Sequence, residues 1–433
     1  MILSFFNRLI HFANKQRRYT LFVISILIST SFFIIKNQVI TLMGIEISTL
    51  VGQMDETGMY NFGDYTYQVN HLIRTGSLVE DGQVLNRYTP GYPLLLYGTF
   101  VLAERIQIKF VYALFLISAL FIACSTVIIG EMASLVYQSR GAAFLAGLLY
   151  ATHPYMLQGL SKVMSVTPFM TIFYLGLLVW LIFILKKPAN FLYPALAGFL
   201  LGLAMLIRPI ALFLPLIFMV LTLVFLKKAA WWRRLIHALV LGGVTVLTIL
   251  PWQIFNSRHE QQILLSSDKV HSMIDGIWFN DHPDKQAIKL PDDVNDLTKD
   301  LVSKDFSSRG DFFKLVFQEF RQQPMAVIKL YLIKAVRSWY GVFGQDAKKE
   351  LFKMFISGFY LLLFLAALFK INFREPTWKI YGWSALVLIL YFWAMTILVV
   401  SMARYMYPVF GLMVVFIPGM LNFLKHIATK NRK

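Results

Sequence analysis

Cysteine and charge are both scarce in this chain. Cys124 is the single cysteine among 433 residues, which excludes an intrachain disulfide, and its apolar surroundings predict a small core residue. Charged residues make up 15% of the sequence, whereas soluble domains have about a quarter. The sequence also lacks a Cys/His metal cluster, a phosphate-binding loop and a dinucleotide fingerprint. These absences argue against a soluble nucleotide-binding protein or a zinc protein.

Long apolar runs are what the chain has instead. Hydrophobic residues make up 58% of it, and its mean hydropathy is +0.62. Runs of about 17 to 25 apolar residues recur, the length that crosses a bilayer as a helix. The sequence therefore predicts an all-α polytopic membrane protein. We expect about ten transmembrane helices, at residues 20–42, 109–135, 141–160, 163–185, 190–207, 209–226, 234–253, 352–370, 379–400 and 405–424.

The distribution of charge predicts the orientation. If the N-terminus is cytoplasmic, the ten spans place only two acids inside, Glu131 and Glu375, and the other acids fall in outer segments. Lys and Arg then gather on the cytoplasmic side, as the positive-inside rule requires. We expect both termini in the cytoplasm. The same rule accounts for the net charge of +18 without a nucleic-acid partner.

Two outer segments are long enough to carry function. Residues 43–108 form the first, within an N-terminal membrane domain of residues 1–253. Residues 254–351 form the second, before the C-terminal helices and basic tail of residues 352–433. Residues 326–340 are apolar but carry three basic side chains, so we expect a short amphipathic helix on the outer membrane surface. An eleventh span is the alternative.

Carboxylates in the first long segment are candidates for proton transfer. Asp55 and Glu56 follow the first span by about a dozen residues, and a carboxylate at that level can accept a proton from an acceptor hydroxyl. Asp64 is a second candidate. The alternatives are that these acids are simply solvated, or that Asp64 caps a following short helix.

Three arginines on the outer side are candidates for binding an anion. Arg87 precedes a turn with the sequence Pro-Gly-Tyr-Pro, which would hold its side chain in place. Arg208 and Arg404 each stand at the expected start of a span, where a helix N-terminus also favours an anion. The planar guanidinium suits phosphate because it donates two parallel hydrogen bonds. Contact with lipid headgroups is the alternative for each.

Two further residues have both a functional and a purely structural interpretation. His153, at the outer end of the third expected span, could bind a metal near carboxylates or simply be an interfacial polar group. Trp252, like other aromatic residues near span ends, could stack on a sugar or belong to an aromatic belt.

Together these segments resemble the GT-C glycosyltransferases of the family-39 type, which include protein O-mannosyltransferases and bacterial aminoarabinose transferases. The resemblance rests on the following segments: Asp55-Glu56, Arg87 with Gly91-Tyr92, the Gly-rich run 198–204 with Arg208-Pro209, Pro251-Trp252 with Asn256, and Arg404-Tyr405 with Pro408.

The resemblance implies transfer of a sugar from a polyprenyl-phosphate donor to a glycan, lipid or protein acceptor, at the periplasmic face of a bacterial inner membrane. It implies catalytic roles for Asp55 and Glu56, and donor-phosphate contacts from Arg87, Arg208 and Arg404. We also expect substrate contacts from Tyr88, Tyr92, His153, Trp252 and Tyr405.

The chain departs from the family pattern in two places. A few extra residues between Asp55 and Gly76 make Asp64 a rival for the catalytic position. No acid follows the third expected span, so a divalent metal is left open and no other cofactor is expected. A lipid-linked-oligosaccharide flippase without chemistry is the alternative function, but apolar spans and acids in outer loops favour an enzyme.

Overall fold

The computed structural model describes residues 16–42, 54, 59–227, 229–260, 273, 276–277, 290–304, 309–342, 347–369, 371, 373 and 375–420. By packing, the chain divides into two units. Unit 1 contains residues 1–267, 370–382 and 414–433, and unit 2 contains residues 268–369 and 383–413.

The elements of unit 1 are α2 (Arg17–Leu42), η2 (Gly63–Tyr65), α3 (Thr66–Thr75), β1 (Val79–Glu80), β2 (Gln83–Val84), α4 (Gly91–Arg105), α5 (Phe110–Tyr137), α6 (Arg140–Ala151), α7 (Pro154–Gln158), η3 (Gly159–Ser161), α8 (Val166–Lys186), α9 (Leu192–Ile207), η4 (Pro209–Ala211), α10 (Leu214–Phe225) and α11 (Trp231–Glu260). Unit 2 contains α13 (Asp292–Ser303), α14 (Arg309–Gln322), α15 (Pro324–Arg337) and α16 (Ala347–Leu368). Helix α17 (Pro376–Leu398) belongs in part to each unit, and α18 (Ala403–Val414) belongs almost wholly to unit 2.

Apolar helices dominate the described residues. Seven are long and apolar enough to cross a membrane, and three are apolar but shorter, at Arg140–Ala151, Leu192–Ile207 and Pro209–Phe225. These ten helices fall in order on the ten apolar segments expected from the sequence. The chain is therefore a multi-pass membrane protein of the all-α class. The described residues also contain a short antiparallel hairpin, formed by β1 and β2 with two residues each.

Two expectations within the spans were wrong. The third expected span, 141–160, breaks after Ala151, because Pro154 starts the separate short helix α7. Cys124 lies on an exposed face of α5 and is not a core residue. The hydropathy pattern locates a span but does not say which face of it meets other helices.

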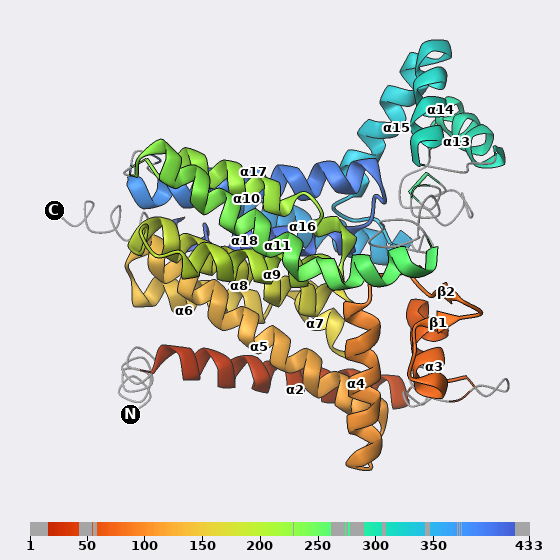
Figure 1. The fold of residues 1–433 in the computed structure, drawn as a ribbon, viewed down its shortest axis with the longest axis horizontal. Helices are drawn as coiled ribbons and strands as arrows, with labels where there is room; N and C mark the ends of the chain where they lie inside the picture. Colours follow the sequence, from red (N-terminus) through yellow and green to blue (C-terminus); the bar gives the residue numbers. More distant parts are fainter. Residues whose placement is uncertain are drawn as a thin grey trace. The chain divides into compact units, whose positions relative to one another are not determined.

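Close helix packing holds unit 1 together. Helix α5 packs against α2, α6 and α8, while α9 lies between α8 and α11 (Figure 1). A Cβ on Gly198 of α9 would overlap the carbonyl oxygen of Leu241 on α11, so only glycine permits this approach. At one end of the α2–α5 pair, the side chains of Arg17 and Arg18 both pair with Glu131.

Unit 2 contains a small helical cluster in which α13 and α14 both pack against α15. Its core includes Val294 and Leu297 of α13, Phe312 of α14 and Leu330 of α15. The amphipathic segment expected at 326–340 is thus a helix, α15, of 14 residues. It is not among the helices long enough to span a membrane within the described residues, which argues against an eleventh span.

Candidate active site

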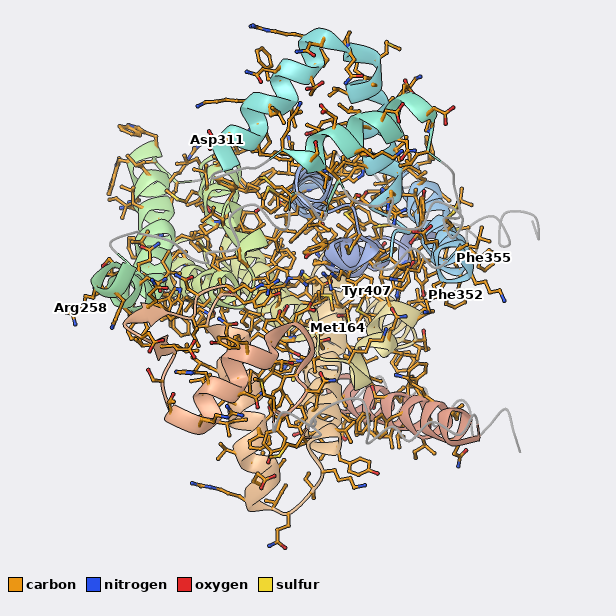
Figure 2. The ribbon with its side chains drawn as sticks, turned by 90° about the vertical axis from the view of Figure 1, so that its right-hand side faces the viewer. Met164, Arg258, Asp311, Phe352, Phe355 and Tyr407 are labelled. Atoms are coloured by element: carbon orange, nitrogen blue, oxygen red, sulfur yellow. The ribbon has the colours of Figure 1, made fainter. Side chains whose placement is uncertain are left out.

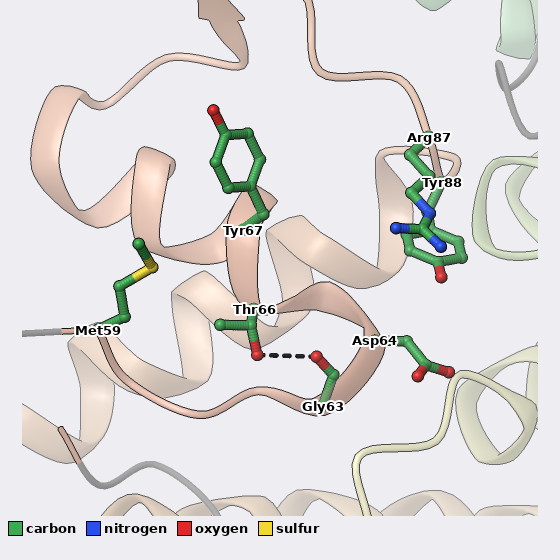
Figure 3. A pocket seen from close by; sticks show the side chains of 7 residues that line it. All are labelled: Met59, Gly63, Asp64, Thr66, Tyr67, Arg87 and Tyr88. Carbon is green, nitrogen blue, oxygen red and sulfur yellow. Dashed lines mark hydrogen bonds between the residues drawn. The ribbon is translucent and has the colours of Figure 1, made fainter. Parts of the chain in front are cut away.

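A pocket of about 300 Å³ opens where the segment before α3 meets the segment before α4. Its lining residues are Met59, Gly63, Asp64, Thr66, Tyr67, Arg87 and Tyr88. Figure 3 shows Asp64, Arg87 and Tyr88 along one side of the pocket, with Met59 opposite them. Two of the residues singled out for chemistry in the sequence, a carboxylate and a guanidinium 23 positions apart, therefore share one pocket.

A short turn positions Asp64. Gly63 has a φ of 62°, in the left-handed region that favours glycine, and it opens the 3₁₀ turn η2. The hydroxyl of Thr66 accepts from the Phe62 backbone N–H at 2.9 Å and donates to the Gly63 carbonyl at 2.7 Å. The N-cap residue of α3 is Tyr65, whose side chain forms no capping hydrogen bond. The alternative that Asp64 is the cap of the helix is therefore wrong, and its exposed carboxylate lines the pocket.

A buried glutamine joins the two segments of chain that line the pocket. The amide nitrogen of Gln68, on α3, donates to the Leu85 carbonyl and, at 3.3 Å, to the Tyr88 carbonyl. This contact ties the backbone beside Arg87 to the helix that follows Asp64. The guanidinium carbon of Arg87 lies 5.5 Å from the centre of the Tyr88 ring, within the range of a cation–π contact.

The start of α4 is fixed by contact with the end of α9. A Cβ on Gly91 would lie 2.7 Å from the Leu206 carbonyl oxygen, so a larger residue would push the two helices apart. Helix packing at Gly91 therefore fixes the backbone at the start of α4, after Arg87.

Tyrosine rings connect the pocket to Arg208. The ring of Tyr65 lies 4.6 Å from that of Tyr88 and 4.8 Å from that of Tyr92, measured between centroids. The Tyr65 hydroxyl donates to the hydroxyl of Ser165 at 2.9 Å. Burial raises the pKa of Tyr92 well above its ordinary value, while the positive charge of Arg208 acts in the opposite direction.

Arg208 itself is 9% exposed and ends α9, with the 3₁₀ turn η4 directly after it. Helix α10 begins at Leu214, five residues later than the helix start expected at Pro209. Tyr92 and Arg208 therefore belong to the same polar region as the pocket, on its buried side. Tyr65 and Ser165 were not singled out from the sequence, because a tyrosine and a serine a hundred residues apart give no local signal.

Two other candidate residues have well-defined structural positions. His153 is fully buried, caps α7 by accepting the Tyr155 N–H at 3.2 Å, and burial lowers its pKa to about 3. His153 is therefore neutral at ordinary pH. Because it is buried, it is not the interfacial polar group that was one of the two expectations. Trp252 is 8% exposed and packs with Leu72 of α3 and Val84 of β2.

Asp55 and Glu56 lie outside the described residues, so their roles stay predictions. Arg404 and Tyr405 lie at the start of α18 in unit 2, where the Arg404 guanidinium carbon is 5.3 Å from the Tyr405 ring centre. Within the described residues no three His, Cys, Asp or Glu side chains gather in a way that could hold a metal ion. Of the residues that line the pocket, Asp64 alone is a carboxylate.

Comparisons with known proteins give matches in structure only. No protein-family model and no curated protein matches the sequence. The structure is similar to the archaeal oligosaccharyltransferase AglB from Archaeoglobus fulgidus, in complex with an inhibitory peptide and a dolichol-phosphate. That likeness has a TM-score of 0.51 and 12% identity over 97% of this chain. The chain spans about half of AglB, 52% of its length.

The structure is also similar to ArnT from Cupriavidus metallidurans bound to undecaprenyl phosphate. That likeness has a TM-score of 0.39 and 15% identity over 90% of this chain and 77% of ArnT. The likeness to AglB shows a shared fold.

Proposed function

We propose that the chain is an inverting glycosyltransferase. It moves a sugar from a polyprenyl-phosphate donor to a glycan, lipid or protein acceptor, at the periplasmic face of a bacterial inner membrane. The observation that carries the proposal is the pocket that joins Asp64 to Arg87 in a multi-pass membrane protein. Transfer of a sugar from a phosphate ester to a hydroxyl requires two groups, a base for the hydroxyl proton and a positive charge for the phosphate. A carboxylate and a guanidinium in one pocket provide them.

Arg87 binds the donor phosphate in this proposal. When the sugar–phosphate bond breaks, negative charge grows on the phosphate, and the guanidinium stabilises it through two parallel hydrogen bonds. Arg87 is exposed and lines an open pocket, so a lipid phosphate can reach it without unfolding the loop. Arg208, beside Tyr92, adds a second positive charge on the buried side of the same region.

Asp64 accepts the proton of the acceptor hydroxyl. The hydroxyl attacks the anomeric carbon on the face opposite the phosphate, so the anomeric configuration inverts through an oxocarbenium-like transition state. Tyr88 and Tyr67 line the pocket and offer ring faces and hydroxyls to the sugar. Asp55 and Glu56, which lie outside the described residues, remain the rival candidates for the role of Asp64. The described lining of the pocket contains one carboxylate, and the proposed mechanism does not use a metal ion.

The flippase alternative is less well supported. Helix α16, a candidate span, carries the charged residues Glu350 and Lys353, but both lie in its first two turns rather than at mid-span. A transporter that binds its substrate at the membrane midplane would place such groups deeper.

Mass spectrometry of envelope lipids and glycans from a deletion strain tests the function. We expect one glycan or lipid species to lose a sugar while the polyprenyl-phosphate-linked donor accumulates. Wild-type protein should restore the species, and an Arg87→Ala variant expressed to the same level should not. Accumulation of the lipid-linked sugar on the cytoplasmic face alone would instead support the flippase.

The orientation is tested separately by cysteine labelling in a Cys124→Ser background. A cysteine in place of Asp293 should react with a membrane-impermeant thiol reagent in intact spheroplasts. A cysteine in place of Lys187, at the end of α8, should react only after permeabilisation. In the structure Lys187 is exposed and the Asp293 side chain is 40% exposed. The opposite labelling pattern would place the pocket on the cytoplasmic side and contradict the proposal.

A further inference from the structure

The short segment that carries Arg87 is held by a side-chain amide. The amide nitrogen of Gln68 donates to the carbonyls of Leu85 and Tyr88, which stand on either side of Asn86 and Arg87. Both partners are carbonyl oxygens, which only accept hydrogen bonds, so the nitrogen of the amide must face them. One side chain of α3 therefore brackets the backbone on which Arg87 stands.

The chain around this segment has a further fixed point on each side. Upstream, the Leu85 backbone N–H donates to the Leu78 carbonyl at 2.8 Å, which continues the pairing of the β1–β2 hairpin. Downstream, Tyr92 of α4 is 2% exposed, and its hydroxyl forms a hydrogen bond with the backbone of Met164, which is labelled near the centre of Figure 2. The Gln68 amide supplies an anchor between these two points.

The amide of Gln68 is paired on one side only. Gln68 is 3% exposed, and its side-chain oxygen is buried with no hydrogen-bond partner among the residues that the structure describes. A buried polar atom without a partner costs stability, which offsets what the two donated hydrogen bonds contribute. Gln68 therefore adds little net stability, and its donor side indicates a role in placing the Arg87 segment.

Asn70, two positions further along α3, is a fully paired amide. Its oxygen accepts from the Tyr60 backbone N–H at 2.9 Å, and its nitrogen donates to the Tyr60 and Thr66 carbonyls, each at 2.7 Å. At 4% exposure it is as deeply buried as Gln68. Asn70 has the pairing expected of a residue that stabilises the fold, and it contacts a different segment of the chain.

We propose that Gln68 is a positioning residue for the Arg87 guanidinium. Because it fixes the backbone on both sides of Arg87, less of this segment has to become ordered when a phosphate binds. Gln68 is not among the residues that line the pocket, so its effect on binding must pass through Arg87. This inference rests on the proposed role of Arg87 in binding the donor phosphate.

A double-mutant cycle tests whether the effect of Gln68 passes through Arg87. The full-length protein in detergent is titrated calorimetrically with a polyprenyl phosphate. Gln68→Met keeps the length of the side chain but cannot donate, so it should weaken binding by about 2- to 10-fold, the equivalent of one ordinary hydrogen bond. In an Arg87→Ala background the same change should alter the affinity by less than about twofold.

Two variants serve as controls. Gln83→Met makes the same change at an exposed position of β2 and should not alter the affinity. Asn70→Leu removes a buried amide from the same helix as Gln68 and should lower the melting temperature. Any change in affinity that Asn70→Leu causes should be equal in the presence and the absence of Arg87.

Gln68→Glu provides a second readout through its pH dependence. At about pH 8 its carboxylate has no proton to donate to the Leu85 and Tyr88 carbonyls, so binding should be weaker than in the wild type. Burial raises the pKa of a carboxyl group, so protonation at about pH 5.5 should restore a donor. The affinity should then approach that of the wild type measured at the same pH.

The outcomes separate this inference from the proposed function. Wild-type affinity of Gln68→Met, or an equal loss of affinity with and without Arg87, would overturn the inference and leave the proposed function intact. If Gln68→Met does not fold, Gln68→Glu takes its place in the cycle, and failure of both variants to fold would show that Gln68 is structural. Wild-type affinity of Arg87→Ala would instead contradict the proposed phosphate contact, and with it the role of Gln68.

Discussion

The two units handle their charged side chains in opposite ways. In unit 1, Asp64 and Arg87 are exposed around an open pocket, held by a buried frame that includes Gln68. In unit 2, Arg337 and Glu350 are buried and the apolar side chains of their helices point outward. An exposed charge costs little stability and is accessible to a substrate, whereas a buried charge is costly unless it is paired. Mutations should therefore affect turnover at the pocket, and stability at the buried ion pair of Arg337 and Glu350.

The largest effect is expected in the pocket, on turnover. Asp64→Asn keeps the size of the side chain but removes the base, so the rate of sugar transfer should fall by about 10²- to 10⁴-fold. The melting temperature should not change, because the carboxylate is exposed. Asp81→Asn, on the exposed β1–β2 turn, is the matched control and should keep full activity. If Asp64→Asn is active while Asp55→Asn is inactive, the catalytic assignment moves to Asp55.

A comparable effect is expected in unit 2, on stability. Glu350→Gln leaves the buried Arg337 without its charged partner, which should lower the free energy of unfolding by roughly 3–5 kcal/mol. The control is Asp293→Asn, which breaks an ion pair with Lys329 whose side chains are 40% and 45% exposed and should cost less than about 1 kcal/mol. Thermal melting in detergent measures both. Equal effects would contradict the contrast between buried and exposed charges.

The smallest effect concerns His153, a buried titratable group of unit 1. Its pKa of about 3 in the folded protein lies below the ordinary 6.5, so the unfolded chain binds the extra proton between these values. The neutral histidine therefore contributes its full stability above about pH 6.5, and this contribution is lost as the pH falls toward 3, by at most about 1.4 kcal/mol per pH unit.

Melting temperatures measured from pH 7 to pH 4.5 check this sign. The wild type should lose stability faster than His153→Gln as the pH falls. Parallel curves for the two proteins would show that His153 is not buried as a neutral group.

The sequence predicts the spans well, because runs of apolar residues alone decide which segments cross a bilayer. It also identifies Arg87 and Asp64 as candidate site residues. It does not predict that they line one pocket, because the connection runs through Gln68, whose contacts with the Leu85 and Tyr88 carbonyls depend on tertiary structure.

The buried charges of α15 could not be predicted from the sequence either. An apolar helix with Lys334 and Arg337 on one face is expected to turn that face to water, as an amphipathic helix on the membrane surface does. In the structure this face is buried, because the helices of unit 2 provide Glu350 and other polar groups to receive it. Periodicity identifies the two faces of a helix but not the surroundings that each face meets.

The most direct test of the account is donor binding by the two pocket variants. Purified wild type, Arg87→Ala and Asp64→Asn should be titrated with a polyprenyl phosphate in detergent and assayed for turnover in parallel. We expect Arg87→Ala to weaken binding by about 10- to 100-fold, and Asp64→Asn to bind like the wild type while losing turnover. Wild-type affinity in Arg87→Ala, together with wild-type turnover in Asp64→Asn, would contradict the assignment of this pocket as the site of sugar transfer.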